Sequence, residues 1–205
     1  NLGIKHSIIP IGEIYDSFQN SLECEFKGLE PDITEENLQS RCRGVILMAL
    51  SNKSGEIVLT TGNKSETAVG YSTLYGDTAG GFGVLKDVPK TLVYELARYR
   101  NTISNVIPER IIERPPSAEL APDQQDSDSL PDYDTLDKII ELYVEQDKSK
   151  KEIEESGIES SILNRVIRLI DFSEYKRRQA PLGVKITSRG FGKDRRYPIT
   201  NKFLK

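Results

Sequence analysis

The chain has 205 residues, of which 37% are hydrophobic and 29% are charged, and its net charge at pH 7 is -4. These values are typical of a soluble globular domain with a core of its own, and they exclude a general attraction to nucleic acid or to an anionic membrane. Cys24 and Cys42 are too few for a disulfide framework, which favours a reducing cytoplasm.

The first elements along the chain are expected to be a strand and a helix. Residues 5–12 (KHSIIPIG) have the apolar content of a short buried strand, closed by a proline and a glycine. Residues 13–22 carry Ile14, Phe18 and Leu22 at intervals of four, which predicts a helix with one apolar face.

A longer helix and a second strand are expected next. Asp32, followed three residues later by Glu35, is a capping pattern that predicts a helix start. This helix is expected to run to about Leu50, before Gly55 breaks it, and to be followed by a strand at residues 57–61 (IVLTT). A strand, a helix and a strand at this spacing favour a parallel α/β arrangement. The apolar stripe expected on the helix is Leu38, Cys42, Val45, Ile46 and Leu50.

The second half of the chain is expected to be mainly helical. Pro89 can begin a helix over residues 90–101, because its missing N–H falls among donors that are unpaired at a helix start. Residues 115–134 are rich in Pro, Asp and Ser, which predicts an exposed, mobile loop. Helices at residues 135–145 and 162–180, separated by an exposed charged stretch, are expected to precede an irregular tail.

The strand at residues 57–61 ends in a run of polar residues, TGNKSE. Ligands of open α/β sheets bind outside the carboxyl ends of the strands. Gly62 would allow close backbone approach, and the hydroxyl of Thr61 could bond a sugar, a base or a phosphate. The alternative is a plain strand-to-helix turn, in which the threonines and Asn63 only cap the helix. This segment alone does not separate the two interpretations.

Longer motifs favour the binding interpretation. The pattern TGNKSE…GYSTLYGD…K…VY.LA, followed by RPPSAEL, DQQDSDSLPDYDTLD, YKRRQAP and SRGFGKDRRYPI, resembles NAD synthetase, and more narrowly the synthetase domain of its bacterial glutamine-dependent form. The resemblance covers residues 1–203. It implies an α/β, parallel-sheet, Rossmann-like adenine nucleotide α-hydrolase (ATP pyrophosphatase) fold. Residues 1–114 would form its sheet part, residues 115–134 a mobile flap over the active site, and residues 135–205 the C-terminal helices and tail.

The resemblance also implies a ligase reaction in two steps. ATP adenylates the nicotinate carboxylate of deamido-NAD and releases pyrophosphate, and ammonia then converts the adenylate to NAD and AMP. A separate glutaminase domain supplies the ammonia from glutamine. Because two polyanionic substrates must come together, Mg²⁺ is the expected cation beside ATP. The resemblance further implies a cytoplasmic homo-oligomer that binds neither nucleic acid nor membrane.

Seven positions match the ligand contacts of the family. The positions expected to contact ATP are Thr61, Lys90 and Ser117. The positions expected to contact deamido-NAD are Asn37, Arg41, Glu66 and Lys176. Glu66 is also the expected Mg²⁺ ligand. Apart from the resemblance, Arg41 would be interpreted as a solvated helix charge, and no residue is assigned to the chemical step itself.

Some features depart from the family pattern. Leu74 stands where ammonia-dependent relatives carry a lysine, and Tyr175 where they carry a histidine; the first of these favours the glutamine-dependent subgroup. The family's phosphate loop, SGGxDS, does not occur in these residues, nor does a glutaminase domain. The chain is therefore expected to be the C-terminal part of a longer polypeptide and to be inactive alone. Another amidotransferase of the ATP-pyrophosphatase superfamily and a non-catalytic interaction module remain as alternatives.

Overall fold

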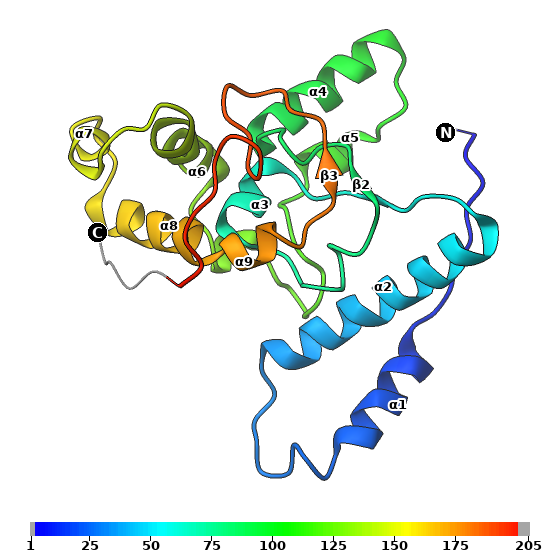
Figure 1. Cartoon of the computed structure of the whole chain (residues 1–205). Helices are drawn as coiled ribbons and strands as arrows, with labels where there is room; N and C mark the ends of the chain where they lie inside the picture. The colour runs from blue at the N-terminus through cyan, green and yellow to red at the C-terminus, as the bar shows by residue number, and fades with distance from the viewer. Residues whose placement is uncertain (1–2, 201–205) are drawn as a thin grey trace.

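A three-stranded sheet lies at the centre of the computed structural model, which describes residues 3–200 (Figure 1). Its strands are β1 (Leu59–Thr60), β2 (Phe82–Gly83) and β3 (Leu182–Gly183), in that order and all parallel. Leu59 lies opposite Phe82, which lies opposite Leu182. The predicted α/β class and parallel sheet are therefore confirmed, although the strand expected at residues 57–61 is reduced to two residues.

The helices α1 (Gly12–Leu22) and α2 (Ile33–Ser54) contact each other and extend away from the sheet (Figure 1). The predicted capping box of α2 is confirmed, because an Asp32 carboxylate oxygen accepts the N–H of Thr34 at 2.7 Å and Glu35 accepts the N–H of Asp32 at 2.8 Å. The helix ends at Gly55, whose φ of 76° lies in the left-handed region that glycine adopts at little cost.

Only Cys42 is fully buried in the apolar stripe expected on α2. Val45 and Leu50 are 65% and 50% exposed, whereas Ser40 and Gly44 are buried. The small residues are buried because the backbone of a neighbouring loop packs directly against them. Apolar periodicity therefore predicted the helix correctly but not its buried face.

The strand expected at residues 5–12 is wrong. Residues 3–11 precede α1 without regular structure, and Ile8 is 87% exposed. A short apolar run forms a strand only where a neighbouring strand accepts its backbone hydrogen bonds, and nothing within residues 3–200 pairs with it. The parallel sheet is instead built from segments that are far apart in the sequence.

The hydrophobic core lies between α3 (Lys64–Val69), α6 (Tyr133–Ile140) and α8 (Ser160–Phe172). The last of these helices turns one apolar face inward at intervals of three and four residues. Its buried residues are Leu163, Val166, Ile167 and Ile170. The helix predicted at residues 135–145 is confirmed, because α6 continues directly into a π-helix, η2 (Glu141–Glu145).

The remaining helices include one departure from expectation. α4 (Lys90–Ile103) follows Pro89 as predicted, and α5 (Glu109–Glu113) comes next. The charged stretch between the last two predicted helices is not all exposed, because it contains α7 (Lys150–Glu154), which fully buries Ile153.

The last predicted helix, at residues 162–180, is divided at Ser173 into α8 and α9 (Glu174–Arg177). A short 3₁₀ helix, η1 (Asp126–Asp128), lies in the segment expected to be a loop. None of the helices within residues 3–200 is both long and apolar enough to cross a membrane.

The core assignment predicts the cost of two leucine truncations. Leu163 on α8 is 0% exposed, so Leu163→Ala should lower the free energy of unfolding by about 2–5 kcal/mol. Leu96 on α4 is 44% exposed, so the matched control Leu96→Ala should cost less than about 1 kcal/mol. Urea unfolding of both variants measures the difference. Equal costs would mean that the core is not where the structure places it.

Candidate functional site

The polar residues that follow β1 cap α3. The side-chain oxygen of Asn63 accepts the N–H of Glu66 at 2.9 Å, and the Glu66 carboxylate accepts the N–H of Asn63 at 3.3 Å. Asn63 therefore caps α3, as one of the two interpretations of this segment expected. Thr61 and Gly62, which precede the cap, line a cavity, so capping leaves the binding interpretation open.

Glu66 also forms an ion pair with Lys90. The Nζ of Lys90 lies 3.1 Å from Oε1 of Glu66, and the two side chains are 18% and 20% exposed. Lys90 is the first residue of α4, and its ammonium lies 5.3 Å from the centre of the Tyr133 ring. A partly buried carboxylate beside an ammonium at a helix start can accept both a cation and an anionic group of a ligand.

The carboxylate of Asp137, on α6, fixes the first turns of α3 and α4 relative to each other. One of its oxygens accepts the backbone N–H and the hydroxyl of Thr91, each at 2.9 Å. The other accepts the hydroxyl of Ser65, and Ser65 in turn accepts the N–H of Lys90 at 2.8 Å. Because Glu66 follows Ser65 on α3, these bonds also hold the Glu66–Lys90 pair in place.

Two cavities meet at Glu66. The larger, of about 620 Å³, has the volume of a typical ligand pocket and is lined from α2, from α4 and from the segment that follows α5. The smaller, of about 100 Å³, lies at the end of β1. The residues that line both cavities are Glu66, Tyr71, Ser72, Asp77 and Lys176.

Most of the predicted site residues lie at these cavities. Those that line the larger one are Asn37, Glu66, Lys90, Ser117 and Lys176. Thr61 lines the smaller one and is thus separated from the two other positions expected at ATP. Arg41 is not among the residues that line either cavity. The ligand contacts of all seven residues stay predictions.

The side chains of Arg41 and Asn37 both hold a loop. The Nε of Arg41 donates to the backbone carbonyl of Leu74 at 3.2 Å, and the amide oxygen of Asn37 accepts the hydroxyl of Thr73 at 2.8 Å. The two residues therefore face the same side of α2, as their spacing predicts. In this structure their shared effect is to position residues 73–77.

Asp77 ends this loop and is a site residue that sequence reasoning missed. It lines both cavities, and its carboxylate accepts the N–H of Thr73 at 2.7 Å. Burial raises the pKa of Asp77, although the N–H of Thr73 opposes the shift. The available signal was an acidic residue directly after a glycine in a loop rich in hydroxyl groups.

Lys176, on α9, brings a half-buried ammonium to the same place. Its Nζ donates to the carbonyls of Gly70 and Ser72, at 2.7 and 2.8 Å. Burial lowers the pKa of Lys176, and the charge of Asp77 partly offsets this. The boundary between the two cavities therefore carries carboxylates and an ammonium that have been partly removed from water, where their effect on a bound charge is strong.

The segment expected to form a flap, residues 115–134, borders the larger cavity. It is anchored more firmly than its composition suggests, because Leu130 is only 5% exposed and belongs to the core. Within the segment, the buried Asp126 accepts the hydroxyl of Tyr133, the first residue of α6, at 2.6 Å. The part nearer its beginning touches α2, where Gln124 donates to Glu36 at 3.1 Å. Its mobility stays a prediction.

Comparison with known proteins identifies related sequences. A family described as NAD synthase matches residues 1–180. The chain is 57% identical over 202 residues to a glutamine-dependent NAD(+) synthetase of Acinetobacter baylyi, a match that covers 98% of this chain and 37% of that protein. The chain thus spans little more than a third of the length of this relative.

Solved structures are similar as well. A glutamine-dependent NAD+ synthetase from Acinetobacter baumannii, in complex with ADP, is 50% identical with a TM-score of 0.55, and the match covers 98% of this chain and 36% of that one. An NMN synthetase from Francisella tularensis is 27% identical with a TM-score of 0.70, and the match covers 86% and 65% of the two chains.

The close packing of the 73–77 loop on α2 predicts the effect of one methyl group. A Cβ at Gly44 would lie 2.7 Å from the carbonyl oxygen of Tyr75. Alanine favours a helix by about 1 kcal/mol over glycine. Gly44→Ala should nevertheless destabilise the protein, by a net 1–3 kcal/mol or so, and should speed hydrogen exchange at the N–H of Asp77, which bonds to Ser40 at 3.1 Å.

The matched control is Gly12→Ala in α1, where nothing lies within 4 Å of the added Cβ. This change should be neutral or slightly stabilising. Thermal unfolding and amide exchange measure both variants. A Gly44→Ala protein as stable as the control, with unchanged exchange at Asp77, would show that the loop is not held by this contact.

Proposed function

The chain belongs to the NAD synthase family, and we propose that the protein is a ligase that amidates deamido-NAD to NAD at the expense of ATP. The observation that supports this best is the pair of cavities that share Glu66, Asp77 and Lys176. Two large substrates must place a carboxylate and a phosphorus atom in contact, and two binding spaces with one charged boundary suit that requirement.

ATP would reach from Thr61 in the smaller cavity toward Lys90, and deamido-NAD would occupy the larger cavity beside Asn37. The nicotinate carboxylate attacks the α-phosphorus of ATP, and pyrophosphate leaves. Ammonia then attacks the carboxyl carbon of the adenylate, loses a proton, and expels AMP to give the amide. Lys90 and Lys176 would offset the negative charge that gathers at the reacting phosphate. The segment 115–134 would shield the adenylate from water as a flap over the larger cavity.

Mg²⁺ is the cation that this chemistry calls for, and the residues fit one mode of holding it. Within residues 3–200 there is no group of three or more His, Cys, Asp or Glu side chains that could hold a metal alone. Mg²⁺ commonly binds through one or two carboxylates together with substrate phosphates. Glu66 would be its protein ligand, and the ion would neutralise phosphate charge.

The source of ammonia and the assembly belong to the same proposal. The relatives from Acinetobacter are named as glutamine-dependent, so we infer that glutamine supplies the ammonia through a separate domain. We further propose that residues 1–205 are part of one synthetase domain, and that the protein works as a homo-oligomer in the cytoplasm.

Glu66 gives the sharpest test of this function. In the complete protein, Glu66→Gln keeps the size of the side chain but removes its charge. NAD formation from ATP, deamido-NAD and ammonia should fall on the order of 10²-fold, because an electrostatic group at the reacting phosphate is lost. The control is Glu95→Gln on the exposed side of α4, which should leave the rate unchanged.

Product analysis by chromatography, together with thermal unfolding of each variant, separates the outcomes. A wild-type protein that makes no NAD would contradict the proposed function. An unchanged rate with a lower melting temperature in Glu66→Gln would make Glu66 a capping residue only. Because one similar structure is an NMN synthetase, the same assay is run with nicotinate mononucleotide. Preferential formation of NMN would show that the protein is an NMN synthetase instead.

A further inference from the structure

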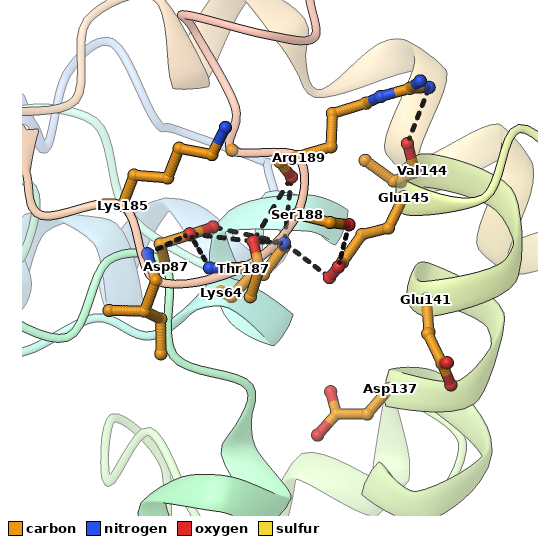
Figure 2. Close-up of polar contacts among 12 residues, drawn as sticks. Lys64, Asp87, Asp137, Glu141, Val144, Glu145, Lys185, Thr187, Ser188 and Arg189 are labelled. Carbon is orange, nitrogen blue, oxygen red and sulfur yellow. Dashed lines mark hydrogen bonds and ion pairs between the residues drawn. The ribbon is translucent and has the colours of Figure 1, made fainter.

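Lys64 lies at the centre of a buried polar cluster that the proposed reaction does not use (Figure 2). Its side chain is 0% exposed. The ammonium lies 2.7 Å from a carboxylate oxygen of Glu145 and 3.2 Å from one of Asp87. It also donates to the hydroxyl of Thr187 and, at 3.0 Å, to the carbonyl of Arg189.

Asp87 connects this cluster to the backbone of the C-terminal segment. One of its oxygens accepts the N–H groups of Ile186 and Thr187, both at 2.9 Å, and the Thr187 hydroxyl at 2.8 Å. Burial alone would raise the pKa of Asp87, but these hydrogen bonds and the charge of Lys64 outweigh it and lower the pKa. Asp87 is therefore ionised at neutral pH, and the segment around Thr187 is held by a charge.

The cluster places one ammonium between two carboxylates with little access to water. Such an arrangement is costly to bury, and it adds less to stability than apolar packing of equal volume can. It does favour a single arrangement of the segments that it joins, because a charged group that loses its partner inside a protein is strongly unfavourable. Lys64 thus joins four separate parts of the chain: the first turn of α3, the segment between β2 and α4, the end of η2 and the segment after β3.

The fastened segment leads directly to the smaller cavity. Ala180 and Pro181 form part of the wall of that cavity. Lys86 donates to the carbonyl of Pro181, and β3, which follows, pairs with β2. Lys64 and Asp87 then hold the chain at Thr187, a few residues further on. The wall is therefore fixed by a row of contacts that ends at the Lys64 cluster.

The larger cavity depends less on this segment. It shares five lining residues with the smaller one, but most of its wall comes from α2, from α4 and α5, and from the segment 115–129. The residues that contact the Lys64 ammonium are not among those that line it. A disturbance of the cluster should therefore reach the two cavities unequally.

We propose that Lys64 is a positioning residue for the smaller cavity, because its buried contacts with Asp87, Glu145 and Thr187 hold the C-terminal segment that forms the wall beside Thr61. This inference rests on the proposed function, in which the smaller cavity receives part of ATP. Lys64 acts through the wall, and it contacts no substrate.

The test replaces Lys64 by methionine in the complete protein, which removes the charge but keeps much of the volume. ATP binding with Mg²⁺ should weaken on the order of tenfold in calorimetric titration, since a misplaced wall loses contacts with its ligand. Binding of deamido-NAD should change less than about twofold. In steady-state kinetics the KM for ATP should rise in the same proportion while the KM for deamido-NAD stays constant.

A purely structural role would give a different result. A smaller folded fraction lowers the measured kcat but leaves both KM values unchanged. The amide exchange of Ile186 and Thr187 adds a readout that needs no activity, and it should be faster in Lys64→Met because the hydrogen-bond acceptor Asp87 is no longer held.

Two further variants keep the test decisive. Thr187→Val removes only the hydroxyl shared by Lys64 and Asp87 and preserves side-chain shape, so it should show the same selective loss of ATP binding, to a smaller extent, even if Lys64→Met does not fold. The matched control is Lys185→Met. Lys185 pairs at the surface with Asp194, at 2.7 Å, and extends away from the cluster (Figure 2), so this variant should bind both substrates normally.

The outcomes separate this inference from the proposed function. Equal ATP affinities in the wild type, Lys64→Met and Thr187→Val would overturn the inference alone. Equal weakening of both substrates would also overturn it, since the effect would then be general. A wild-type protein that binds no ATP would contradict the proposed function, and the inference with it.

Discussion

The first turn of α3 must satisfy its polar groups without water, and much of the molecule is arranged around that constraint. Lys64 and Ser65 are both 0% exposed, and Asn63 is 3% exposed. Asn63 caps the turn itself through Glu66, whereas the other two reach distant parts of the chain: Lys64 contacts Asp87 and the C-terminal segment, and Ser65 contacts Asp137. Because a buried polar group without a partner costs about 1–3 kcal/mol, these contacts set where α4, α6 and β3 lie relative to β1.

The path of the chain explains why charged groups gather at the boundary between the two cavities. β1 leads into the turn that caps α3, and Glu66 lies in this turn. The 73–77 loop follows α3 and places Asp77 at the same cavities. α9 adds Lys176 from the distant end of the chain. Helix and strand ends supply these groups, while the core beneath them consists of apolar residues from α3, α6 and α8. A rigid base therefore carries short polar segments, which suits the binding of charged ligands.

Local signals in the sequence were reliable, and signals that depend on distant partners were not. The Asp32–Glu35 box, Gly55 and the helix after Pro89 are each decided within a few residues, and all are confirmed. The predicted strand at residues 5–12 and the predicted apolar stripe of α2 both failed, because each depends on distant packing partners that the sequence alone does not identify. Most of the site residues that the motifs predicted line the two cavities. Lys64 and Asp77 were missed because a lysine or an aspartate in a turn is usually solvated, and only the folded chain removes their water.

The π-helix η2 bears on the length of the chain. A π-turn holds one more residue than the α-turn it replaces, and each residue of an α-helix advances the direction of the next by about 100°. Loss of one residue between Glu141 and Glu145 would convert this stretch to an ordinary α-turn, so Glu145 and the chain that follows it would keep nearly their present direction. The same loss within α6 would rotate everything that follows it. Lineages of this protein should therefore accept a single-residue deletion in η2 more readily than in α6.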